Sequence, residues 1–205
     1  MKRKDFYLVA LIGFLVGWLV ALPAANIGVA ITPKFFFVSV LGFTLFAPFA
    51  LWILHLLSKR WDVFEQFGKF AAVGTLNTLL DLGVLNLLML LTNLASGYPF
   101  MGFKAISFLA ATTNSYFWNK FWTFGNQIPV TAKEYLRFAF FTLGGVVINV
   151  TVASIVVNVI GAPHSISLKL WANIGALCGV FAGFLWNFLS YKLVVFKKYD
   201  KPILN

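Results

Sequence analysis

The sequence predicts an all-α integral membrane protein with six transmembrane helices. Three observations predict this class. First, 60% of the 205 residues are hydrophobic and only 11% are charged, which gives a mean hydropathy of +0.88. Second, apolar runs recur that reach the roughly 20 residues needed to cross a bilayer as a helix. Third, the basic residues are distributed unevenly between the loops that would join these helices.

The six predicted spans differ in how polar they are. Four apolar runs contain no charged residue: 6–25, 35–57, 138–160 and 170–191. Two further runs are interrupted, because 70–94 contains Asp81 and 105–122 contains Asn114, Asn119 and Lys120. The first run follows a basic segment but is longer than the apolar core of a signal peptide, so we expect a retained helix.

The loop charges predict the orientation of these spans. If both termini lie on the same side, 13 of the 16 Lys and Arg residues face that side, and Lys34, Lys104 and Lys169 face the other. Positive loops favour the cytoplasm, so we expect a multi-pass protein of the cell membrane with cytoplasmic N- and C-termini. The net charge of +10 then faces anionic membrane lipids, and nucleic-acid binding is not expected.

The spans group into hairpins with short polar connections. Residues 1–57 form an N-terminal hairpin, and residues 58–69 form a linker that is either an amphipathic interfacial segment or a solvated loop. Residues 70–198 form a four-helix domain, and residues 199–205 form a cytoplasmic tail. The four-helix domain resembles two copies of one hairpin, because polar residues recur 72 positions apart: Asn77 with Asn149, Asn86 with Asn158, and Lys120 with Lys192. Hairpins duplicated in this way keep one orientation, as a parallel repeat.

Small residues recur every four positions on two spans of this domain. Gly175, Gly179 and Gly183 share one helix face, and Ser107, Ala111 and Ser115 share another. Small residues let membrane helices approach closely, so both stripes predict tight helix packing.

Asp81 is the one acidic residue well inside an apolar run. An acid there costs about 2.5–3.5 kcal/mol on insertion scales, so it requires a partner or a purpose. Two interpretations follow: a proton- or cation-coupling site, or a structural hydrogen bond to Asn149 or to another facing side chain.

Two lysines carry the main candidate for a binding site. Lys120 and Lys192 lie near the cytoplasmic ends of their spans, and each follows an asparagine, Asn114 or Asn187, placed deeper in the membrane. One interpretation is that both lysines extend to the headgroups. The other is that they bind a lipid phosphate, for which ammonium and amide groups are suited. The full candidate set comprises Lys69, Asn77, Asn114, Lys120, Arg137, Asn149, Asn187 and Lys192.

No pattern of catalytic residues occurs. The single cysteine, Cys178, excludes an intrachain disulfide, and no metal-ligand spacing, phosphate-binding glycine loop or Ser/His/Asp set is present. We therefore expect neither enzymatic chemistry nor a cofactor.

Several motifs resemble the GtrA family of small polytopic membrane proteins. They are KFAAVGTLNTLLDLGVLNLL at 69–88, NSYFWNKFWTF at 114–124, RFAFFTLGG at 137–145 and NFLSYKLVVFKK at 187–198. The resemblance covers about residues 64–198. At Lys120 many members of the family carry arginine, so the charge is kept but a bidentate contact is lost.

The resemblance implies a four-helix membrane domain that flips a polyprenyl-phosphate-linked sugar for cell-surface polysaccharide or glycoconjugate synthesis. A second hypothesis is a non-transporting anchor of a polyprenyl-phosphate glycosyltransferase. A third is a small proton-coupled exporter that uses Asp81. The expected partners are the sugar lipid and anionic membrane lipids, and a membrane glycosyltransferase and a second copy of the chain are further candidates.

Overall fold

The computed structural model describes residues 2–26, 29–61, 63–94, 97–163 and 168–197. Within these residues every regular element is helical, so the predicted all-α membrane class is confirmed. The predicted tail lies outside the described residues. The chain divides into two compact units, residues 1–125 (unit 1) and residues 126–205 (unit 2), and each unit is described by itself.

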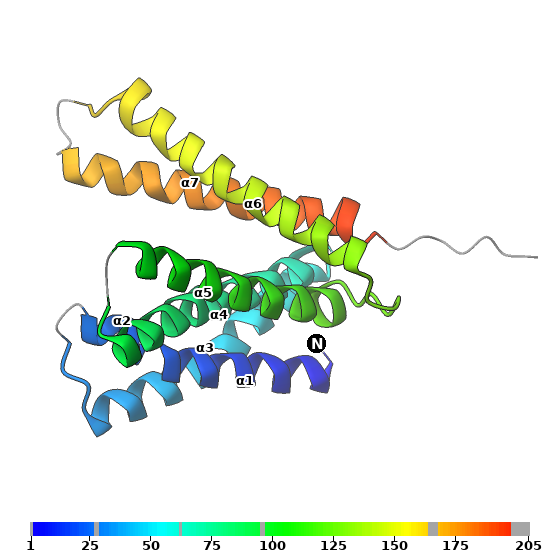
Figure 1. Cartoon of the computed structure of the whole chain (residues 1–205). Helices are drawn as coiled ribbons and strands as arrows, with labels where there is room; N and C mark the ends of the chain where they lie inside the picture. The colour runs from blue at the N-terminus through cyan, green and yellow to red at the C-terminus, as the bar shows by residue number, and fades with distance from the viewer. Residues whose placement is uncertain (1, 27–28, 62, 95–96, 164–167, 198–205) are drawn as a thin grey trace, which may run out of the picture. The chain divides into compact units, whose positions relative to one another are not determined.

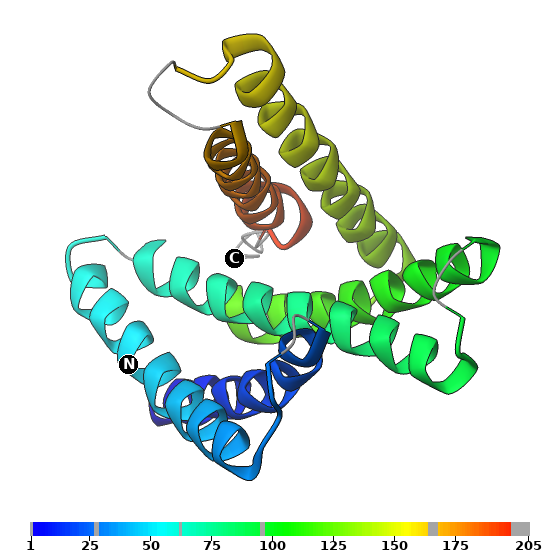
Figure 2. The same cartoon turned by 90° about the vertical axis from the view of Figure 1, so that its left-hand side faces the viewer.

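Unit 1 contains two helical hairpins (Figures 1 and 2). The first consists of α1 (Arg3–Leu19), the short α2 (Ala21–Asn26) and α3 (Pro33–Ser58). The second consists of α4 (Val63–Thr92), α5 (Gly97–Trp118) and the π-helical turn η1 (Asn119–Thr123). Because α3 ends at Ser58 and α4 begins at Val63, most of the predicted linker lies in the first two turns of α4.

Close backbone approach joins the first hairpin. A Cβ atom on Gly17 would lie 2.5 Å from the Cα of Val40, and one on Gly13 would lie 2.8 Å from the carbonyl carbon of Phe43. Small residues are therefore required where α1 crosses α3. The start of α3 is capped by Thr32, whose hydroxyl accepts a hydrogen bond from the Phe35 N–H at 3.2 Å.

The core of unit 1 lies between α1, α3 and α4. Val9, Ile12 and Val73 are at most 1% exposed, and they pack with Leu51 and Trp122. The side chain of Trp122 comes from η1, so the end of the second hairpin is part of this core. The N-terminal hairpin is thus packed on α4 and η1 of the second hairpin rather than tethered beside them.

Unit 2 is one hairpin, made of α6 (Ala132–Ser154), η2 (Ile155–Ile160), α7 (Leu168–Ser190) and η3 (Tyr191–Val195). Its glycine stripe packs as predicted: a Cβ atom on Gly183 would lie 2.6 Å from the backbone oxygen of Gly145, and Gly175 lies against the side chain of Val157. The close contact of α6 and α7 therefore depends on the absence of side chains on α7.

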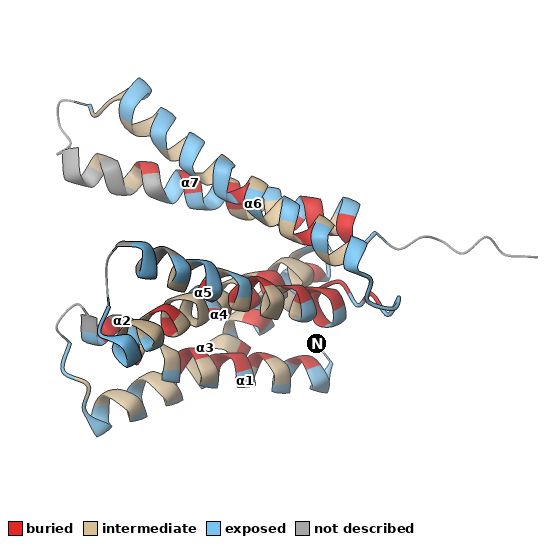
Figure 3. Cartoon of the chain, viewed as in Figure 1, coloured by how far each residue is buried: buried red, intermediate tan, exposed pale blue. Residues whose placement is uncertain are grey.

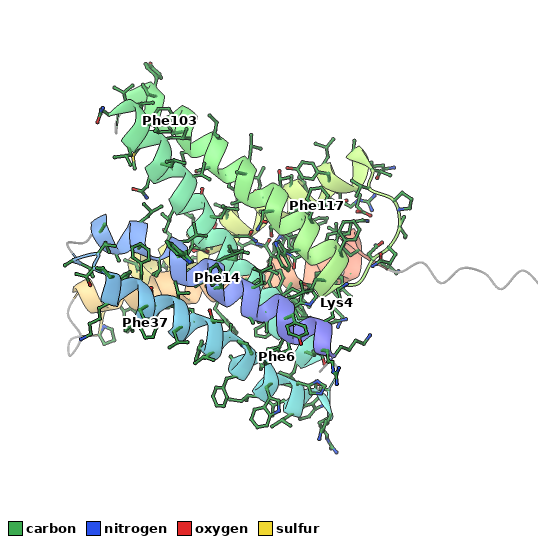
Figure 4. The ribbon with its side chains drawn as sticks, turned by 90° about the horizontal axis from the view of Figure 1, so that it is seen from below. Lys4, Phe6, Phe14, Phe37, Phe103 and Phe117 are labelled. Atoms are coloured by element: carbon green, nitrogen blue, oxygen red, sulfur yellow. The ribbon has the colours of Figure 1, made fainter. Side chains whose placement is uncertain are left out.

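The outer surfaces of the helices are apolar, as a lipid environment requires. Figure 3 shows exposed residues along much of α6. Figure 4 shows Phe14, Phe37 and Phe117 projecting outward from unit 1, with 42%, 67% and 45% of their surfaces exposed. By length and composition, four stretches of the described chain can each span a membrane: Pro33–Ser58, Val63–Thr92, Ala132–Ile160 and Leu177–Val195. This part of the chain is therefore a multi-pass membrane protein.

The other two predicted spans are α1 and α5. Among the described residues, neither meets the same criteria of length and apolar composition. Helix α1 has 17 residues, about 26 Å at the usual rise per residue. Helix α5 carries Lys104, Ser107 and Asn114, whose polar groups bind side chains of α4.

Candidate functional site

Two π-helical turns end the two hairpins of the four-helix domain at equivalent positions. The N–H of Phe124 donates to the carbonyl of Asn119 at 2.9 Å, and the N–H of Phe196 donates to the carbonyl of Tyr191 at 2.8 Å. Both pairs are separated by 72 residues (191 − 119 = 72, 196 − 124 = 72), which is the spacing of the predicted repeat. Turns of this kind are rare and often occur at functional sites.

Each π-helical turn carries its lysine at the second position. Lys120 is 0% exposed, and its Nζ lies 5.8 Å from the ring centroid of Phe121. Lys192 is half-buried, with its Nζ 5.8 Å from the ring of Phe188. A lysine that reaches for headgroups exposes its ammonium group, so the burial of Lys120 favours an internal role. The placement of Lys192 fits either interpretation.

The predicted asparagines of unit 1 bind each other. The Nδ2 of Asn114 on α5 donates to the Oδ1 of Asn77 on α4 at 2.7 Å. Asn119, at the start of η1, is 1% exposed and donates to the carbonyl of Ser115 at 2.9 Å. Its Oδ1 is buried and accepts no hydrogen bond from the described residues. Asn119 lies within a predicted span but is not among the predicted site residues.

The predicted asparagines of unit 2 pack against glycines. Asn187 on α7 lies against Gly145 of α6, and Asn149 on α6 lies against Gly179 of α7. The Oδ1 of Asn187 is buried and has no donor among the residues described here. Arg137, on the first turns of α6, lies at the same end of this antiparallel hairpin as Lys192. Unit 2 thus carries two basic side chains at one end and an amide deeper along α7.

Lys69 is held by two carboxylates at the start of α4. Its Nζ lies 2.9 Å from the Oδ1 of Asp5 on α1 and 3.0 Å from the Oε1 of Glu65. The indole Nε1 of Trp122 also donates to the Oδ1 of Asp5, at 2.9 Å. The other oxygen of Glu65 lies 2.7 Å from the Nδ1 of His55. Lys69 is therefore the centre of a network that joins α1, α4 and η1.

Asp5 precedes the apolar run of α1, and it is 4% exposed. Burial alone would raise the pKa of Asp5, but the hydrogen bonds from Lys69 and Trp122 outweigh it and hold the pKa below the ordinary value. The carboxylate is thus charged at neutral pH. Its role was not visible in the sequence, where Asp5 is the last residue of a short basic segment.

Asp81 pairs with Lys104 across the second hairpin. Its Oδ2 accepts a hydrogen bond from the Nζ of Lys104, and its Oδ1 accepts one from the hydroxyl of Ser107 at 2.6 Å. The expectation that another facing side chain binds Asp81 is met by these two residues of α5. No group of three His, Cys, Asp or Glu side chains within the described residues is placed to hold a metal ion.

Comparisons with known proteins identify the family. The model of the GtrA/DPMS transmembrane domain matches residues 69–196, which is more than half of the chain. The chain belongs to the GtrA/DPMS family. It is also 29% identical over 138 residues to "Uncharacterized membrane protein YngA" of Bacillus subtilis (strain 168), covering 64% of this chain and 80% of the relative. No solved structure matches the chain.

The GtrA/DPMS domain begins at Lys69 and ends at Phe196. It thus includes α4 from its second turn onward, together with α5, α6, α7 and all three π-helical turns. Its first residue is bound by Asp5 and Glu65, which both lie outside the matched region. Membership of the GtrA/DPMS family supports a membrane function related to polyprenyl-phosphate-linked sugars.

Proposed function

We propose that this protein translocates a polyprenyl-phosphate-linked sugar across the cell membrane for cell-surface polysaccharide or glycoconjugate synthesis. The observation that carries the proposal is the pair of π-helical turns, which place Lys120 and Lys192 at equivalent points of the two hairpins of a GtrA/DPMS domain. Translocation involves no covalent chemistry, so the protein acts as a transporter without a cofactor rather than as an enzyme.

The substrate is recognised through its phosphate. A phosphate that leaves the headgroup region loses its hydration, which is strongly penalised unless polar groups replace the water. Lys192 and Arg137 are both partly exposed at one end of unit 2, so they make the first contacts. Asn187 lies about one turn deeper, with a buried amide oxygen that no described residue binds, and its Nδ2 can donate to a phosphate oxygen.

Lys120 and the paired amides act at a later stage. Because Lys120 is fully buried, a phosphate reaches it only after the helices around η1 separate. The Asn77–Asn114 hydrogen bond then exchanges for bonds to the phosphate, and Asn149 takes the corresponding role in the other hairpin. Lys69 remains bound to its carboxylates. It contributes to the approach of the phosphate to the protein, not to the movement of the phosphate across the membrane.

The orientation follows from the positive-inside rule. The basic ends of α1, α4 and α6 face the cytoplasm, and with them both π-helical turns. The substrate therefore enters from the cytoplasmic leaflet, where anionic lipids also bind the basic surface.

The test is transport by the purified full-length protein in liposomes. Sugar lipid is supplied to one leaflet, and its appearance in the other is followed by access to a membrane-impermeant glycosidase. Because charge-assisted hydrogen bonds contribute about 1.5–3 kcal/mol each, Lys192→Gln is expected to weaken polyprenyl-phosphate binding roughly tenfold to a hundredfold and to slow transport. Lys133→Gln, an exposed base on the first turn of α6, is the matched control.

Wild-type binding and transport by Lys192→Gln would remove Lys192 from the phosphate site. Complete absence of transport by the wild-type protein would instead favour the anchor of a polyprenyl-phosphate glycosyltransferase. In that case the protein acts through a partner enzyme, and co-purification with the enzyme is the measurement that identifies it.

A further inference from the structure

A polar pocket opens at the end of unit 1 where α1 and α4 begin and where α3 and η1 end. It has a volume of about 340 Å³, near the lower limit of the roughly 300–1,000 Å³ of small-molecule sites. Its lining includes Lys2, Ser58, Gln66, Lys69 and Thr123. The pocket is therefore large enough for one small polar group, and its lining does not suit an apolar lipid chain.

Two side chains that line this pocket, Gln66 and Thr123, have a buried polar atom with no hydrogen-bond partner among the described residues. Thr123 is 4% exposed, and its hydroxyl makes no hydrogen bond to any described residue. The Oε1 of Gln66 is also buried and accepts no bond from the part of the chain described here. Leaving such groups unsatisfied costs about 1–3 kcal/mol each, so both atoms favour a ligand that can donate hydrogen bonds into the pocket.

The charges of the pocket disfavour an anion. Lys69 is the most buried cation in its lining, and Asp5 and Glu65 compensate its charge at 2.9 and 3.0 Å. A phosphate carries acceptor oxygens, which would face the carboxylate of Glu65 and the amide oxygen of Gln66. Sugar hydroxyls both donate and accept hydrogen bonds, so they match these partners where a phosphate does not.

An aromatic ring completes the pocket. Trp122 lines it, and the indole is fixed in place by its hydrogen bond to Asp5. Most of the ring packs in the core of unit 1, and the 8% of Trp122 that is exposed offers the pocket a small apolar contact, which suits the C–H groups of a sugar ring. Lys2 is exposed in the same lining, where it can approach the phosphate that joins a sugar to its lipid.

We propose that this pocket binds the sugar ring of the lipid-linked substrate, with Gln66, Thr123 and Glu65 as hydrogen-bond partners and Trp122 as an apolar contact. The inference rests on the proposed function for the identity of the ligand. It assigns a binding role to α1 and α3, which lie outside the GtrA/DPMS domain. Ser58 of α3 lines the pocket, and Asp5 of α1 binds two of its lining residues, Lys69 and Trp122.

The experiment measures binding of two lipids to the full-length protein in nanodiscs. One is polyprenyl phosphate, and the other is the same lipid carrying a hexose, an N-acetylhexosamine or a pentose. The wild-type protein is expected to bind one of the sugar lipids more tightly than the bare phosphate. Gln66→Met and Thr123→Val keep the side-chain shape and are each expected to weaken sugar-lipid binding about fivefold, with bare-phosphate binding unchanged. Gln127→Met, at an exposed position, is the matched control.

A second measurement does not depend on these variants. A cysteine placed at Gln66 in a Cys178→Ser protein is expected to react more slowly with a charged maleimide when the sugar lipid is present, and at an unchanged rate with the bare phosphate. Equal protection by both lipids, or equal loss of affinity for both lipids in the two variants, would overturn the sugar pocket.

The two proposals fail in different ways. If the pocket variants weaken sugar-dependent binding but the wild-type protein shows no transport in liposomes, the translocation proposal is refuted and the sugar pocket stands. If the wild-type protein transports the sugar lipid but both pocket variants bind it with unchanged affinity, the sugar pocket is refuted and the translocation proposal stands.

Discussion

The Asp81–Lys104 pair gives the sharpest test of a structural role against a coupling role. The two side chains expose 22% and 45% of their surfaces and join α4 to α5. Removing one partner of a buried pair leaves an uncompensated charge and costs about 3–5 kcal/mol. Because Lys104 is partly exposed and its long side chain can turn toward the headgroups, we expect Asp81→Asn to lower the free energy of unfolding by about 2–3 kcal/mol.

The double variant Asp81→Asn/Lys104→Met is expected to recover most of this loss, because no charge is then left without a partner. The two substitutions should therefore couple by at least about 1.5 kcal/mol, within the range for residues in contact. Thr78→Val is the matched control, because that hydroxyl is exposed and bonds within its own helix at 3.0 Å. Unfolding in bicelles supplies the free energies.

Additive losses in the Asp81/Lys104 cycle would refute the structural role of the pair. A double variant that regains stability but has lost transport would instead show that Asp81 has a role in transport beyond the ion pair, as proton coupling requires.

Two further predictions concern packing and orientation. Gly183→Ala is expected to destabilise the protein by about 1–3 kcal/mol, because the new Cβ would lie 2.6 Å from the Gly145 oxygen. Gly42→Ala has open space at the Cβ position and is expected to be neutral or to stabilise the protein by up to about 1 kcal/mol. The melting temperatures of the two variants test this difference. A cysteine at Asn205 in Cys178→Ser protein should react with an impermeant maleimide only after the cells are opened; labelling of intact cells would contradict the proposed cytoplasmic C-terminus.

The helices and hairpins were predictable because their signals are local. Apolar run length determines where a helix can span the bilayer, and the spacing of Gly175, Gly179 and Gly183 indicates which face of the last span packs closely. The repeat spacing of 72 residues was equally visible, since it depends only on the order of residues. These signals require no knowledge of how one helix is rotated against another.

The partners of the polar residues were not predictable. Lys69 belongs to the predicted phosphate site, and its sequence surroundings do not show that it binds Asp5, which lies 64 positions earlier in the chain (69 − 5 = 64). The pairing of Asp81 with Lys104 likewise depends on which faces of α4 and α5 meet. The π-helical turns leave no signal in composition or hydropathy, because they differ from an α-helix in hydrogen bonding and not in residue type.

The π-helical turn η3 also fixes how many residues this part of the chain must contain. A π-helical turn holds about one residue more than an α-helical turn, so deleting one residue there would restore a regular helix and rotate everything beyond it by about 100°. Phe196 would then lose its contacts with the rings of Phe138 and Tyr191, whose centroids lie 5.8 Å and 6.2 Å from its own. We therefore expect natural relatives to vary in loop length far more readily than in residue count within η1 and η3.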